Sequence, residues 1–206
     1  MLDPLFRLAL ALALALGLCV SFANAEGISV VKAEARAVDE GYEIVADFKI
    51  VLPPSVSEAL KRGVVLNFIS ELAITRSRWY WLDTDVMSHE QSTKLSYNAL
   101  TRQYRISRGT LFQGFSSLES ALRVLGHQSA PPVPAVALSG SDGYVAQLIQ
   151  GEIRYTAFAQ MRLDVSQLPK PLQVSALTNP DWNLDSERYG WSIVFDAPAP
   201  DGAIKP

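Results

Sequence analysis

The sequence predicts a mainly β fold: an antiparallel sandwich or an open barrel with two short helices. Most apolar stretches alternate with polar residues at a period of two, which is typical of strands that bury one face. Helix-start signals occur at only two places in the 206 residues. A parallel α/β sheet would need a helix between most of its strands, so an antiparallel arrangement is favoured.

The first 25 residues predict a cleavable secretory signal. Arg7 precedes a run of mostly Leu and Ala from Leu8 to Val20, and Ala23 and Ala25 form an A-x-A cleavage motif. The run is shorter than the roughly 20 apolar residues that a membrane span needs. We therefore expect cleavage after Ala25, a periplasmic location and no stable membrane span afterwards. Because the single cysteine, Cys19, lies in this segment, the remaining chain has no disulfide.

The rest of the chain is expected to form one β-rich domain over residues 26–196, followed by a disordered Ala/Pro tail over 197–206. The full chain has a net charge of −3. Nucleic-acid-binding proteins concentrate Lys and Arg, so this balance gives no electrostatic case for a nucleic-acid partner.

The first elements expected are two strands in a hairpin. In residues 43–52 every second residue is apolar and the residues between them are a mixture of polar and apolar types, and residues 28–38 can pair with them. The connection over Asp39–Gly41 ends in a glycine that can adopt a left-handed turn conformation.

Both expected helices follow a capping box, in which a serine precedes a glutamate by three residues. Ser55 introduces a short helix over Glu58–Arg62, which Gly63 stops. The box over Ser116–Glu119 opens a second helix, which runs through Leu125 and is closed by Gly126.

Further alternation predicts most of the remaining strands. They are a long strand over 64–80, a hairpin over 95–106 with a four-residue loop at Asn98–Thr101, strands over 144–150 and 152–164, and a final strand that contains Trp191, Ile193 and Phe195. Prolines and glycines predict a long exposed loop over 128–143. Pro169 and Pro171 predict an extended bend over 168–172.

The motifs of common catalytic sites are missing from the sequence. No G-x-S-x-G surrounds a serine, and the two histidines are His89 and His127. His89 and Glu90 begin an H-E-x-x-H pattern, but Thr93 stands where the second histidine is required. We expect no enzyme activity, no metal and no cofactor; paired carboxylates are the alternative, since sequence spacing does not reveal their distance in space.

One cluster is a candidate binding site. Strand alternation places Arg76 and Arg78 on one face and Trp79 and Trp81 on the other, so that cations and aromatic rings can bind an anionic ligand or a partner. Trp182 is a candidate for the same aromatic site. The alternative is structural: the tryptophans fill the core, and the arginine stems cover it.

Four stretches together resemble a known family: residues 78–81, 95–105, 163–172 and 181–182. The chain resembles the exported bacterial family called domain of unknown function 4390. The resemblance implies no activity and no functional residues. Members of that family are often encoded beside a membrane sensor kinase and a response regulator of the nitrogen-regulation type, which implies an accessory role.

Two functional hypotheses follow. The first is a periplasmic binding or accessory module for an envelope partner, such as the outer region of a sensor kinase; it would use an exposed edge strand, the proline loop or the Arg/Trp cluster. The second is a carrier of a small apolar or anionic ligand, in a β-sheet pocket lined by Trp79, Trp81 and Trp182.

Overall fold

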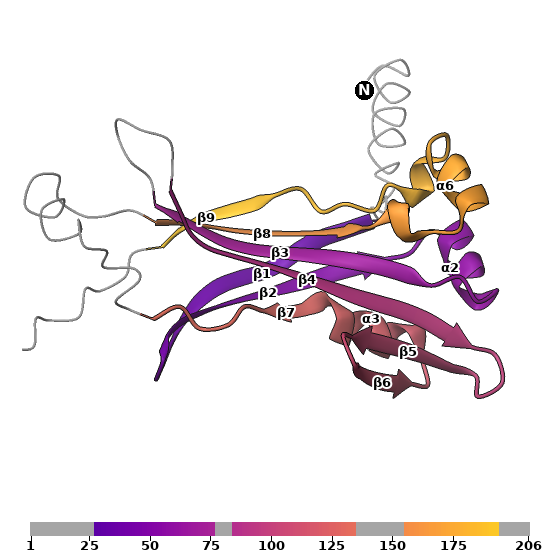
Figure 1. Ribbon diagram of the computed structural model, residues 1–206, viewed down its shortest axis with the longest axis horizontal. Coiled ribbons are helices and arrows are strands. Elements are labelled where there is room, and N and C mark those ends of the chain that lie inside the picture. The colour runs from indigo at the N-terminus through magenta and orange to yellow at the C-terminus, as the bar shows by residue number, and fades with distance from the viewer. Residues whose placement is uncertain (1–26, 77–83, 135–154, 194–206) are drawn as a thin grey trace, which may run out of the picture.

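The computed structural model describes residues 27–76, 84–134 and 155–193. Within these ranges, the small sheet contains β1 (Gly27–Val38), β2 (Gly41–Val51) and β7 (His127–Ser129), in that order. The large sheet has the order β6 (Leu111–Phe115), β5 (Gln103–Arg108), β4 (Thr84–Asn98), β3 (Leu66–Arg76), β8 (Tyr155–Leu163) and β9 (Tyr189–Ile193). Neighbouring strands are antiparallel, and the small sheet lies against one face of the large one (Figure 1). The predicted mainly β, sandwich-like fold is confirmed.

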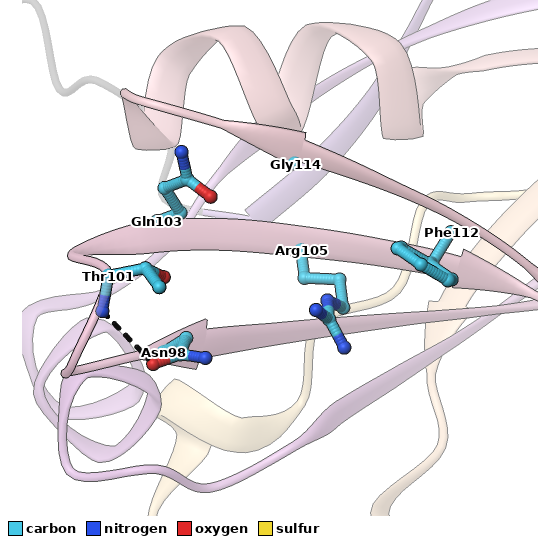
Figure 2. A pocket seen from close by; sticks show the side chains of 6 residues that line it. All are labelled: Asn98, Thr101, Gln103, Arg105, Phe112 and Gly114. Carbon is cyan, nitrogen blue, oxygen red and sulfur yellow. Dashed lines mark hydrogen bonds between the residues drawn. The ribbon is translucent and has the colours of Figure 1, made fainter.

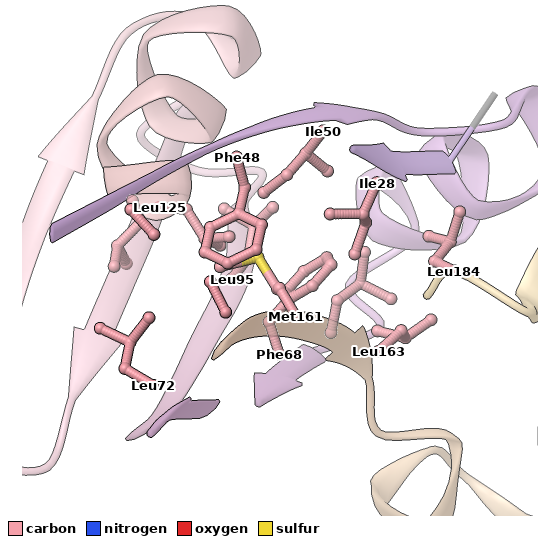
Figure 3. Packing of buried hydrophobic residues seen from close by; sticks show 14 of the residues in the cluster. Ile28, Phe48, Ile50, Phe68, Leu72, Leu95, Leu125, Met161, Leu163 and Leu184 are labelled. Carbon is pink, nitrogen blue, oxygen red and sulfur yellow. The ribbon is translucent and has the colours of Figure 1, made fainter. Parts of the chain in front are cut away.

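The core lies between the two sheets (Figure 3). Phe48 of β2 and Phe68 of β3 enter it from opposite sheets, and Phe68 has no exposed surface. The predicted alternation of β8 is confirmed, because its odd-numbered residues face this core and are buried: Tyr155, Ala157, Ala159, Met161 and Leu163.

The N-terminal hairpin is also confirmed. β1 and β2 pair from Gly27 opposite Val51 to Val38 opposite Gly41. Gly41 has a φ of 136°, and a Cβ there would lie 2.0 Å from the carbonyl oxygen of Val133. Glycine is therefore required at this position both by its backbone conformation and by the approach of another segment.

That other segment corrects the predicted loop over 128–143. Residues 127–129 form β7, and Val133 and Tyr42 exchange two backbone hydrogen bonds of 2.8 and 3.0 Å. Gln128 is 1% exposed. The prolines did not exclude pairing, because they flank the N–H groups of Ala130 and Val133, which donate to β2, and because β7 is an edge strand. Residues 135–143 lie outside the described ranges.

The described residues contain three α-helices, one more than predicted: α2 (Pro54–Lys61), α3 (Leu118–Gly126) and α6 (Lys170–Ala176). The 3-10 turns η1 (Val165–Gln167) and η2 (Pro180–Trp182) flank α6. The bend predicted over 168–172 was wrong. Pro169 caps α6 and Pro171 lies in its first turn, where a helix does not need the missing N–H.

Neither capping box forms as predicted, although both helices exist. α2 begins after Pro53 without a side-chain cap, and the hydroxyl of Ser55 instead donates to Asp181 at 2.7 Å. The cap of α3 is Ser117, one residue later than predicted, and its oxygen accepts a hydrogen bond from the N–H of Ser120. Tertiary contacts and the exact start of each helix decide which hydroxyl acts as a cap.

The hairpin predicted over 95–106 is longer than expected and its loop is shifted. β4 already begins at Thr84, and the four-residue loop is 99–102 because Asn98 pairs with Gln103. Asn98 accepts hydrogen bonds from the N–H groups of Leu100 and Thr101, a local Asx turn that favours this register.

Several predictions fall outside the described residues and stay predictions: the signal over 1–25, the strand over 144–150, Phe195 and the tail over 197–206. The described part of the chain contains no helix with the length and apolar character that crossing a membrane requires.

Candidate binding surface

Arg76 occupies the last position of β3, on the face that carries Phe68 and Leu72. It lies opposite Tyr155 of β8 and forms a hydrogen bond with the Tyr155 side chain. Burial raises the pKa of Tyr155, and the positive charge of Arg76 opposes that rise. Arg76 therefore has a structural contact at the end of the core, as in the alternative interpretation of the cluster.

Trp182 lies at the other end of the sheet. It is 4% exposed and packs in the core, next to the end of β3 that begins at Leu66. Its turn contacts α2 and α6, which lie far from the Arg76 end in Figure 1. Ten residue steps along β3 correspond to about 33 Å. The structure does not bring Arg76 and Trp182 together. Arg78, Trp79 and Trp81 lie outside the described residues, and their roles stay predictions.

A different surface emerges at β6, an outer strand of the large sheet that the sequence did not predict. β6 pairs with β5 on one side, and no described residue forms a backbone hydrogen bond to its other side. Leu111 is 76% exposed and Phe112 is 68% exposed. The overlooked signal is the Gly109-Thr110 pair between two short runs, since Gly109 has a φ of 57° in a two-residue hairpin loop.

The free edge of β1 differs from that of β6 in its register and in its charged side chains. A bulge interrupts its register between Val30 and Lys32, and Glu34 forms ion pairs with Lys32 and Arg36. Hydrogen bonds from Lys32 and Arg36 hold the pKa of Glu34 below its usual range. Bulges and charged side chains discourage the addition of another strand. β6 carries neither a bulge nor a charged side chain.

The face of β4, β5 and β6 that points away from the core contains a shallow hollow of about 120 Å³ (Figure 2). It is lined by Asn98, Thr101, Gln103, Arg105, Phe112 and Gly114. The guanidinium carbon of Arg105 lies 4.6 Å from the centroid of the Phe112 ring, a cation–π distance. The hollow is smaller than the roughly 300 Å³ at which pockets for drug-sized ligands begin.

The segment that forms this surface is basic. Between Glu90 and Glu119 the sequence has four cationic residues and no Asp or Glu: Lys94, Arg102, Arg105 and Arg108. The register places Lys94 and Arg105 on the same face as Phe112, and both are exposed. Arg105 has no ion-pair partner among the described residues. The surface therefore combines free cations, an exposed ring and an unpaired strand edge.

Arg108 is not part of this outer surface but links two elements of the fold. It points to the other face, and its Nη2 donates to the carbonyl oxygens of Val124 and His127 at 3.3 and 3.2 Å. Burial lowers the pKa of Arg108. These carbonyls lie at the C-terminal end of α3, where a cation is favoured. Arg108 thus ties β5 to α3, which packs on β2 of the small sheet.

The histidines and acids of the described residues do not form a metal site. His127 Nδ1 lies 2.7 Å from Asp47 Oδ1, and His89 lies on β4, on the other sheet. Among the described residues, no group of three His, Cys, Asp or Glu side chains has a metal-binding arrangement.

Comparison with known proteins identifies the family of this chain. Neither curated proteins nor solved structures gave a match. The family model described as domain of unknown function DUF4390 matches residues 25–192, which span both sheets and the basic β4–β6 surface. The chain therefore belongs to the DUF4390 family.

Proposed function

We propose that this protein is exported to the periplasm and acts as an accessory module that binds an envelope protein by strand addition at β6. The observation that carries the proposal is the unpaired edge of β6 with Leu111 and Phe112 exposed beside it. The family resemblance suggests the outer region of a sensor kinase as the partner.

An extended segment that adds to a free edge gains main-chain hydrogen bonds, and its alternate side chains contact one face of the sheet. The five residues of β6 offer a short but regular template. Phe112 adds an apolar anchor, because burying most of an exposed Phe side chain contributes about 2 kcal/mol. An edge of this kind supports recognition of a protein segment more directly than catalysis.

Export is tested separately from binding. The protein is expressed in its own cell, the periplasmic fraction is isolated, and the N-terminus of the purified chain is sequenced. We expect the chain to begin at Glu26. A chain that keeps residues 1–25, or that stays in the cytoplasm, contradicts the proposed location.

Binding is tested by photo-crosslinking from a matched pair of positions. One crosslinking residue replaces Leu111 on β6, and the other replaces Val31 on β1, which is similarly exposed at 67%. We expect the β6 position to capture an envelope protein, identified by mass spectrometry, and the β1 position not to capture it. Equal capture at both edges contradicts a site at β6.

Proline substitutions then test whether the free edge itself is used. Consecutive N–H groups of a strand point to opposite sides, so one of Phe112→Pro and Gln113→Pro keeps the β5 ladder and loses an outward donor. Thermal unfolding identifies the variant that stays folded. That variant should lose the capture, whereas Phe112→Ala should only weaken it. Full capture by the folded proline variant refutes strand addition.

A further inference from the structure

We infer that the segment which adds to β6 is acidic, and that one of its carboxylates occupies the hollow beside Arg105. This inference rests on the proposed function and specifies the chemistry of the partner. It follows from the charge of the surface, from the hydrogen-bond donors in the hollow and from the position of Gly114.

The β4–β6 segment carries a local positive charge. The whole chain has a net charge of −3, yet the 28 residues between Glu90 and Glu119 hold four cationic side chains and no Asp or Glu. Arg108 donates hydrogen bonds to the carbonyl groups of Val124 and His127, whereas Lys94 and Arg105 are exposed to solvent on the outer face of the sheet. An acidic segment complements these two charges, and such complementarity selects partners and speeds association.

The hollow offers hydrogen-bond donors from Asn98 and Arg105. Asn98 Oδ1 accepts hydrogen bonds from the N–H groups of Leu100 and Thr101, which leaves the Asn98 amide nitrogen to point away from that turn (Figure 2). Arg105 contributes a guanidinium, whereas the Gln103 atom nearest Gly114 is its amide oxygen, an acceptor. An ionised carboxylate accepts several hydrogen bonds at once and donates none, so it matches the donors of Asn98 and Arg105.

The hollow can be reached from the free edge of β6 at Gly114. Gly114 of β6 lies directly opposite Arg105 of β5. A Cβ at Gly114 would lie 3.4 Å from the flexible end of Gln103 and would contact nothing closer. An added strand lies about 4.8 Å beyond β6. A side chain of that strand beside Gly114 meets no β6 side chain and enters the hollow past the flexible end of Gln103, while the guanidinium of Arg105 lies further in, on the β4 side of β5 (Figure 2).

Two other occupants fit less well. A second copy of this chain would bring the same cationic β4–β6 segment to the edge, so the two copies would repel one another. Anionic lipids can pair with Arg105, but they have no backbone to match the unpaired N–H and C=O groups of β6. An acidic peptide uses both features.

The test begins with a phage-displayed library of random peptides of about ten residues, enough to cover β6 and both flanks. The bait is the mature chain, residues 26–206. We expect enriched peptides to carry Asp or Glu among alternating apolar residues, and the enrichment to disappear with Arg105→Gln. Arg162→Gln is the matched control, because Arg162 is an exposed arginine on the outer face of β8 in the same sheet.

A binding cycle then isolates the carboxylate. An enriched peptide and its version with the acid changed to the amide are compared by fluorescence anisotropy. We expect the amide peptide to bind wild type about tenfold more weakly, and Arg105→Gln to bind both peptides within about twofold of each other. Gly114→Val, which fills the hollow, should reduce the preference for the acid in the same way.

The outcomes separate the inference from the proposed function. Peptides without acidic preference that still need the β6 edge overturn the inference and leave the proposed function standing. Peptides that bind the folded proline variant as well as wild type overturn the proposed function. Arg105-dependent binding to vesicles that contain phosphatidylglycerol, with no acidic peptide enriched, assigns the surface to lipid and overturns the inference.

Discussion

The close approach of α3 to β2 at Gly126 predicts a large loss of stability for a single added methyl group. A Cβ at Gly126 would lie 2.1 Å from the carbonyl oxygen of Phe48, and real Cβ contacts stay beyond 3.0 Å, so α3 and β2 must separate by about 1 Å. A backbone atom cannot turn away as a side chain does. We place the overpacking cost of Gly126→Ala at about 3 kcal/mol, the upper end of the usual range.

Gly114→Ala is the matched control, because it makes the same chemical change where only the flexible end of Gln103 lies 3.4 Å away. Both substitutions reduce the conformational freedom of the unfolded chain, which stabilises each variant by about 0.5–1 kcal/mol. We therefore expect Gly126→Ala to lose about 2 kcal/mol and Gly114→Ala to lose nothing. Urea unfolding followed by tryptophan fluorescence measures both free energies. Equal stability of the two variants would refute the close α3–β2 contact.

Two further predictions concern a part-buried hydrogen bond and a buried tyrosine. Ser55→Ala and Asp181→Ala should each destabilise the protein, with a coupling of about 1 kcal/mol in a double-mutant cycle that measures their hydrogen bond; additive effects would contradict it. Burial raises the pKa of Tyr155 above its ordinary 10.0, so the folded state holds that phenolic proton more tightly than the unfolded state. The stabilisation that follows from the raised pKa of Tyr155 is complete below pH 10, and it is lost as the pH rises through the pKa of Tyr155 in the folded state. Unfolding measured across alkaline pH should show this loss in wild type but not in Tyr155→Phe.

Patterns that depend on burial alone were predicted well from the sequence. The alternation of β8 and of the β1–β2 hairpin follows from which face meets the core, and the structure confirms it. The effect of the prolines on secondary structure was harder to predict. Pro169 starts α6, and the prolines near Val133 flank an edge strand, because in both places no N–H is needed where the ring sits. A proline removes one backbone N–H donor, but it does not exclude a helix or an edge strand at its position.

The candidate site shows the limit of reasoning from single segments. Arg76 and Trp182 were both plausible binding residues from the sequence, but they lie at opposite ends of β3, about 33 Å apart along the strand. The surface at β6 depends on a register that places Arg105 opposite Gly114, and on a two-residue loop at Gly109 that the sequence analysis overlooked. A close inspection of the Gly109-Thr110 pair would have indicated the strand, although not the hollow beside it.

The attachment of the β4–β6 surface bears on how tightly it can bind. Arg108 fixes β5 to the end of α3, and the Gly126 contact fixes α3 to β2, so the surface belongs to the same packed unit as the core. A partner that adds to β6 therefore need not order the receiving strand, and the entropic cost falls on the partner segment alone. If the edge were flexible, the entropic cost of ordering it would offset part of the binding free energy. An unpaired edge that belongs to the same packed unit as the core is thus suited to a binding role at β6.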